Sequence, residues 1–144
     1  MDPGQYKKTL KLLKSSKAPK LLDGLKACYD HNFIRDGGAL APLMGVFNVK
    51  KVSEEVVREA IMALADFCDP PKVDGQPTFS SNGLLLINKK SSGFKGLQRV
   101  AKLIPHDDLA ISTNAVRTIY GVVRSFNENG LGSAEEPIYR SKLS

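Results

Sequence analysis

Few residues in this chain have side chains that could do chemistry, and the closest such pair is Cys28 and His31. On a helix these two would lie one turn apart, near enough for a thiolate and its base or for two ligands of one metal ion. Asp30 lies beside them, and His106 is the other histidine of the 144 residues. Catalysis and metal binding both need more converging groups than this, so we expect no catalytic residue, no bound metal and no cofactor.

Asp107 and Asp108 form a second candidate, because two neighbouring carboxylates can share acid–base work. They stand in the stretch PHDDL, just before a long apolar segment. Carboxylates at that place accept hydrogen bonds from the free N–H groups of a helix start and complement its dipole. We therefore predict that this pair caps a helix.

Two glycine clusters, GGAL (37–40) and SSGFKG (91–96), invite comparison with phosphate-binding loops, since backbone N–H groups at a helix start can hold an anion. Neither cluster contains GxxxxGK[ST] or GxGxxG, although Lys89, Lys90 and Lys95 lie near the second. We expect these glycines to permit a tight turn and close packing.

The net charge of +6 comes from 21 Lys and Arg against 15 Asp and Glu, and much of the excess lies at one end. Seven lysines fall between residues 7 and 26. Lys7, Lys11 and Lys14 share one face at helical spacing, where they could meet phosphate or anionic lipid. The alternative, which we favour, is the solvated outer face of a terminal repeat.

The composition is that of one soluble globular domain, with 42% hydrophobic and 25% charged residues. Cys28 and Cys68, the two cysteines, lie in apolar helical patterns without a CxxC motif, which indicates reduced, buried thiols. The chain shows neither a signal peptide nor an apolar run long enough to span a membrane. We expect a cytoplasmic protein, with the nucleus as the alternative.

Four segments carry a helical period: 5–16, 18–30, 53–68 and 107–126. Ser53, followed by two glutamates, predicts the start of the third. The fourth has an apolar set expected to face the core: Leu109, Ile111, Ala115, Val116, Ile119, Val122, Val123 and Phe126. Shorter apolar pieces lie at 37–47 and 93–104, and GLLLINKK (83–90) is either a strand or, as we prefer, a helix.

The helices follow one plan three times: a short apolar helix, a tight polar turn and a longer apolar helix. Leu25, Leu64 and Ile119 take equivalent places in the longer helices, so all three are expected to be buried. The interval from Leu64 to Ile119 is longer than the interval from Leu25 to Leu64, which fits an exposed loop inserted at 69–81. Residues 127–144 have little apolar periodicity and are expected to form a flexible tail.

HNFIRDGGALAPLMGVF (31–47) and SEEVVREAIMALADFC (53–68) resemble the armadillo repeat family, whose units contain a short helix, a glycine-led second helix and a long third helix. The resemblance covers about residues 5–126. It implies an all-α fold, a right-handed α-solenoid of about two and a half armadillo- or HEAT-like repeats occupying residues 1–126.

In the importin alpha branch of that family, the third helices line a concave groove with recurring Trp and Asn residues. Asp23, Met62 and Arg117 stand at the Trp places here, and Ala27, Asp66 and Gly121 stand at the Asn places, so the peptide ladder itself is not matched. What the resemblance still implies is binding along the concave face, with these partner-binding residues: Arg58, Met62, Asp66, Asn114 and Arg117.

The sequence therefore predicts a non-enzymatic protein–protein interaction module that binds a peptide or partner protein along the concave face. The alternative is a basic helical module that binds nucleic acid or an anionic membrane surface through its N-terminal lysine helix. Neither the identity of the partner nor the oligomeric state follows from the sequence.

Overall fold

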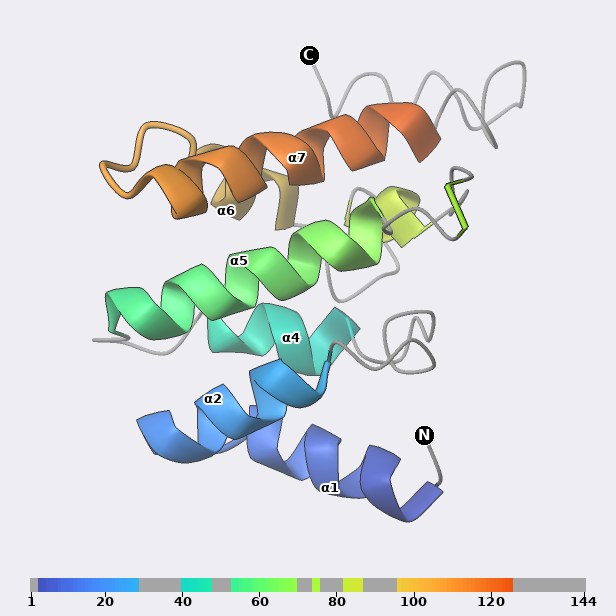
Figure 1. The fold of residues 1–144 in the computed structure, drawn as a ribbon, viewed down its shortest axis with the longest axis vertical. Helices are drawn as coiled ribbons and strands as arrows, with labels where there is room; N and C mark the ends of the chain where they lie inside the picture. Colours follow the sequence, from blue (N-terminus) through green and yellow to red (C-terminus); the bar gives the residue numbers. More distant parts are fainter. Residues whose placement is uncertain are drawn as a thin grey trace.

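The computed structural model describes residues 3–28, 40–47, 53–69, 74–75, 82–86 and 96–125, and this part of the chain contains helices and turns without a strand. The all-α prediction is therefore confirmed. The elements are α1 (Pro3–Leu13), α2 (Ala18–Ala27), α4 (Leu40–Val46), α5 (Glu54–Cys68), the 3-10 helix η2 (Asn82–Leu86), α6 (Gly96–Ala101) and α7 (Leu109–Ser125). Figure 1 shows them stacked from α1 at one end to α7 at the other.

Each of the four predicted helical segments contains a helix, namely α1, α2, α5 and α7. The shorter pieces 37–47 and 93–104 contain α4 and α6, and the described part of 83–90 belongs to η2. Ser53 begins α5 as predicted, because its side-chain oxygen accepts a hydrogen bond from the Val56 N–H at 3.3 Å. Glu54 and Glu55 add negative charge to the first turn, which favours the helix dipole.

A single hydrophobic core runs through the stack, and the longer helices α5 and α7 contribute much of it. Leu25 and Leu64 have no exposed surface, as predicted from their equivalent places. Ile119 is only half-buried, so the expectation that it is buried was wrong. The reason is the rotation of α7, which turns Ile111, Ala115 and Val122 fully inward and leaves Ile119 at the edge of that face.

Small residues let α7 approach its neighbours closely. A Cβ atom on Gly121 would lie 2.6 Å from the Cys68 carbonyl oxygen at the end of α5. A Cβ atom on Gly83 of η2 would lie 2.8 Å from the Val122 Cα atom. Gly121 is therefore a buried packing residue. The family pattern, which places this position on an open groove, is wrong for Gly121.

Two buried hydroxyl groups on the same helix are satisfied locally. The Thr118 hydroxyl donates to the Asn114 carbonyl oxygen, and the Ser125 hydroxyl donates to the Gly121 carbonyl oxygen, both at 2.8 Å. Such bonds remove most of the cost of burying a hydroxyl. The core-facing side of α7 is consequently built from small and partly polar residues.

Two predicted segments fall largely or wholly outside the described residues: the tail 127–144, and the loop 69–81 apart from Asp69, Asp74 and Gly75. Asp74 and Gly75 form a turn with positive φ angles of 51° and 75°. Among the described helices, none has the length and apolar character needed to cross a bilayer.

Candidate functional site

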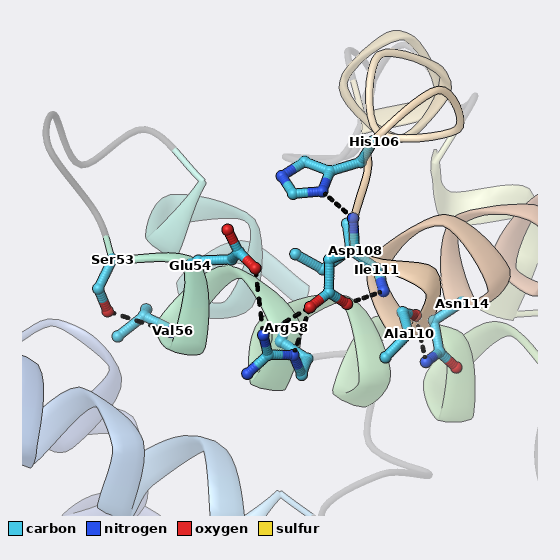
Figure 2. Close-up of polar contacts among 9 residues, drawn as sticks. All are labelled: Ser53, Glu54, Val56, Arg58, His106, Asp108, Ala110, Ile111 and Asn114. Atoms are coloured by element: carbon cyan, nitrogen blue, oxygen red, sulfur yellow. Dashed lines mark hydrogen bonds and ion pairs between the residues drawn. The ribbon is translucent and has the colours of Figure 1, made fainter.

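The start of α7 is tied to α5 by an ion-pair cluster, which Figure 2 shows in close-up. The Arg58 guanidinium donates to one oxygen of Asp108 through Nη2 at 2.6 Å and through Nε at 3.1 Å. Arg58 Nη2 also lies 3.3 Å from the Glu54 carboxylate, one turn earlier on α5. Arg58 thus joins a residue of its own helix to one that follows it by 50 positions.

Asp108 uses its other oxygen to cap α7, accepting the Ile111 N–H at 3.0 Å, while its own N–H donates to His106 Nδ1. The capping role predicted for this residue is confirmed. The hydrogen bond from Arg58, and after it the Ile111 N–H, hold the pKa of the Asp108 carboxyl well below its usual range. The same bond raises the pKa of Arg58.

The lowered pKa of Asp108 makes part of the stability acid-sensitive. Because the folded state favours the charged form, this contribution is complete above the unfolded pKa of about 4 and is lost as pH falls from there toward the lower folded pKa. Asp108→Asn keeps an oxygen for the Ile111 N–H and removes the charge. We expect urea unfolding to show a stability deficit for this variant near neutral pH that shrinks steadily below about pH 4.

Asp107→Asn is the matched control, because Asp107 is the exposed neighbour of Asp108. As an exposed surface substitution, it should change the stability near neutral pH by no more than about 0.5 kcal/mol. Equal pH profiles for the two variants would show that the Arg58 pair does not stabilise the fold.

A second ion-pair cluster joins the end of α5 to the second half of α7. Arg117 Nη2 lies 2.7 Å from an Asp66 carboxylate oxygen and donates to the Asp69 carbonyl oxygen at 2.6 Å. Arg117 Nε and Arg124 Nη1 contact the two Asp69 carboxylate oxygens at 3.2 and 3.0 Å. These side chains are 17 to 31% exposed, so the cluster lies at the surface without being fully solvated.

The five predicted partner-binding residues all lie on α5 and α7. Asp66 and Arg117 are brought into contact with each other, whereas Arg58 pairs with Asp108. The Asn114 amide donates to the Ala110 carbonyl oxygen of its own helix at 2.8 Å, and Met62 is half-buried between Arg58 and Asp66 on α5. The charged groups among them therefore already hold α5 and α7 together.

The sequence interpretation missed the outer face of α7. Five residues of this helix are exposed, spaced by four, three, four and three positions, and none is charged: Leu109, Thr113, Val116, Tyr120 and Val123. The four large hydrophobic ones are 79, 51, 58 and 42% exposed in chain order. We call this set the α7 stripe. The expectation that Leu109, Val116 and Val123 face the core is contradicted by the structure.

The opposite end of the stack is basic. A hollow of about 530 Å³ between α1 and α2 is lined by Lys8, Lys11, Leu12, Lys14, Ser15 and Lys20. Residues 3–28 contain seven lysines and one acidic residue, Asp23, so their net charge of +6 equals that of the whole chain. Figure 1 shows α1 and α7 at opposite ends of the molecule.

The two thiols offer no nucleophile at the surface. Cys28 and Cys68 are buried, as predicted, and the Cys28 thiol donates to the Gly24 carbonyl oxygen at 3.3 Å. Burial raises the pKa of Cys28 to about 12 and also raises the pKa of Cys68. Within the described residues no three His, Cys, Asp or Glu side chains gather as a metal site would require, and His31 lies outside them.

Comparison of the chain with protein-family models, curated proteins and solved structures gives no match. Its function has to be inferred from its own surfaces. Two of these differ from an ordinary solvated face: the uncharged α7 stripe and the lysine-lined hollow.

Proposed function

We propose that this chain is a non-enzymatic protein–protein interaction module, an armadillo- or HEAT-like α-solenoid of about two and a half repeats whose partner lies along α7. The α7 stripe is the observation that carries the proposal. Of the five large hydrophobic side chains exposed among the described residues, four belong to this one helix, and Ile104 is the fifth. Exposed hydrophobic side chains gathered on one helix face in this way are a common mark of an interaction site.

In a stack of helices, the outer faces of the first and last described helices are expected to be polar unless something covers them. The exposed positions of α1 meet this expectation with Lys7, Lys8 and Lys11. The exposed positions of α7 do not, since Val116 and Tyr120 occupy the middle of that face. The α7 end is therefore suited to being covered.

The residues predicted from the sequence have a place in this proposal. Asn114 and Arg117 directly follow Thr113 and Val116 in α7, so they lie at one edge of the stripe. The ion pair with Arg117 holds Asp66 beside the same edge. Together they supply the polar rim that commonly surrounds an apolar interface centre, with Arg58 and Met62 further along α5.

The test is affinity capture from a cell extract with two variants of equal net charge. Val116→Glu with Tyr120→Glu places two charges on the stripe, and Lys8→Ala with Lys11→Ala lowers the net charge by the same amount at the other end. All four side chains are exposed, so both variants should keep the wild-type circular dichroism. We expect the stripe variant to lose at least about tenfold in captured partner, since burying unpaired charge is costly, and the lysine variant to retain it.

Equal capture by the wild type and the stripe variant would overturn the proposed surface. A third variant, Asp66→Lys with Arg117→Glu, separates rim from centre. It preserves attraction between positions 66 and 117 but sets a glutamate at position 117 against Asp69. A smaller loss of capture than for the stripe variant is expected, because rim charges contribute less than a buried apolar centre.

The second candidate function is binding of nucleic acid or an anionic membrane by α1 and α2. The lysine-lined hollow and the net charge of +6 in residues 3–28 favour it. Phosphate contacts of this type release counterions, so binding would fall roughly linearly in log salt concentration. Capture that is lost in the lysine variant and in high salt, but kept in the stripe variant, would select this function instead.

A further inference from the structure

We infer that a second copy of this chain is the partner of the α7 stripe, and that two copies meet α7 against α7 with their lysine ends pointing apart. The inference rests on the proposed function and names its partner. The spacing of the stripe supports a helix as the occupant. Steps of four and three residues repeat every 3.5 residues on average, which is the period of a seam between two packed helices.

Electrostatics favour another copy at this end and oppose it at the other. Residues 3–28 have a net charge of +6, the same as the whole chain. Two chains therefore repel each other strongly when α1 approaches α1. The α7 stripe carries no charge, and α1 and α7 lie at opposite ends of the stack (Figure 1). An encounter through α7 keeps the two lysine clusters as far apart as the molecules allow.

The stripe is also nearly self-complementary about its centre. Val116 lies seven positions after Leu109 and seven before Val123. A two-fold axis at Val116, with the helices antiparallel, would pair Val116 with itself and Leu109 with Val123 of the second copy. Isologous contacts of this kind are the commonest basis of homodimers, and antiparallel helices also oppose their dipoles favourably.

The charges beside the stripe are compatible with the antiparallel arrangement. Arg124, eight positions after Val116, would face Asp108, eight positions before it, on the second copy. Each is already ion-paired within its own chain, Arg124 with Asp69 and Asp108 with Arg58, so this contact adds little to the attraction. Arg117 would lie near the two-fold axis and thus near Arg117 of the second copy. Its charge is already balanced there by Asp66 and Asp69, which limits the repulsion.

The stripe extends about 21 Å along one helix, at 1.5 Å per residue. The stripe has five residues, whereas a standard protein–protein interface has roughly 20 to 30 residues a side, so the dimer should be weak and concentration-dependent. Sedimentation equilibrium from about 5 to about 500 µM should show the mass rising from 15.7 kDa toward twice that value. Val116→Glu with Tyr120→Glu should stay at 15.7 kDa, while Lys8→Ala with Lys11→Ala should dimerise like the wild type.

Disulfide crosslinking tests the geometry independently. The native thiols are buried, so a cysteine introduced on the stripe is the reactive one. Under mild oxidation Val116→Cys should form a covalent dimer, whereas Leu109→Cys should not, because the antiparallel pairing places the two copies of position 109 at opposite ends. Lys8→Cys is the control from the other end of the stack.

A wild-type mass of 15.7 kDa throughout the concentration range would overturn the inference, and so would a dimer that persists in the stripe variant. Fast crosslinking at Leu109→Cys would overturn the antiparallel pairing. A monomer whose stripe variant still loses captured protein from extract would leave the proposed function standing with a different partner. A monomer whose stripe variant captures normally would remove both.

Discussion

Leu64→Ala is expected to lower the free energy of unfolding by about 2 to 5 kcal/mol, the range for deleting a large buried side chain and leaving a cavity. Leu64 has no exposed surface and lies in α5, the helix between the α1–α2 end and α7. A loss of this size is a large part of the stability of a small domain. Urea denaturation followed by circular dichroism measures it.

Leu109→Ala is the matched control, because it makes the same chemical change at a side chain that is 79% exposed. Its effect should stay within about 0.5 kcal/mol at a protein concentration low enough to keep the chain monomeric. Similar losses of unfolding free energy at the two positions would mean that the outer face of α7 is packed within the monomer. That result would contradict both the structure and the proposed function.

Gly121→Ala should be the most damaging single-methyl substitution in the described part of α7. The new Cβ atom would lie 2.6 Å from the Cys68 carbonyl oxygen and 2.7 Å from its carbon, so one helix backbone has to move away from the other. Forcing extra atoms into a packed contact costs about 1 to 3 kcal/mol, and a backbone contact places the effect at the upper end. Thermal unfolding should show a lower midpoint without loss of helix at low temperature.

The same substitution at Gly45 should not lower the stability. Gly45 lies in α4 with nothing within 4 Å of the position where a Cβ atom would be added. Alanine is the better helix former by up to about 1 kcal/mol, so this variant should be as stable as the wild type or more stable. A neutral Gly121→Ala would show that α5 and α7 are not in the close contact described.

The sequence alone predicted the helices well, because their signals are local. The apolar spacing of α5 and its Ser53 cap are contained within 16 consecutive residues, 53–68, and both were confirmed. Asp108 was likewise recognisable as a cap from the residues around it. The burial of Leu25 and Leu64 followed from their equivalent places in two helices.

The orientation of α7 could not be predicted in the same way, because this helix has two apolar faces. The buried face includes Ala115, Thr118 and Ser125, while the exposed face carries Leu109 and Tyr120. The buried face also contains Ile111 and Val122, so both faces are apolar and hydrophobicity alone does not select the inward one. The inward face is set by the close approach of α5 and η2 at Gly121, a tertiary constraint that selects small residues.

The pairing of the candidate site residues was also beyond the sequence. Arg58 and Asp108 are 50 positions apart, and Arg117 and Asp69 are 48 apart. Periodicity places each residue on a helix but not opposite a particular partner. Asp66 and Arg117 do lie in contact, and the structure shows that these charges bind α5 to α7 instead of standing free.

The most direct measurement of whether the α7 stripe is an interaction surface is the rate at which a maleimide labels Val116→Cys, with Lys8→Cys as the reference. In dilute purified protein both cysteines should react quickly, because both positions are exposed. In concentrated protein or in cell extract, we predict that labelling at position 116 slows several-fold while labelling at position 8 is unchanged. Equal rates at the two positions under all three conditions would contradict an interaction surface on α7.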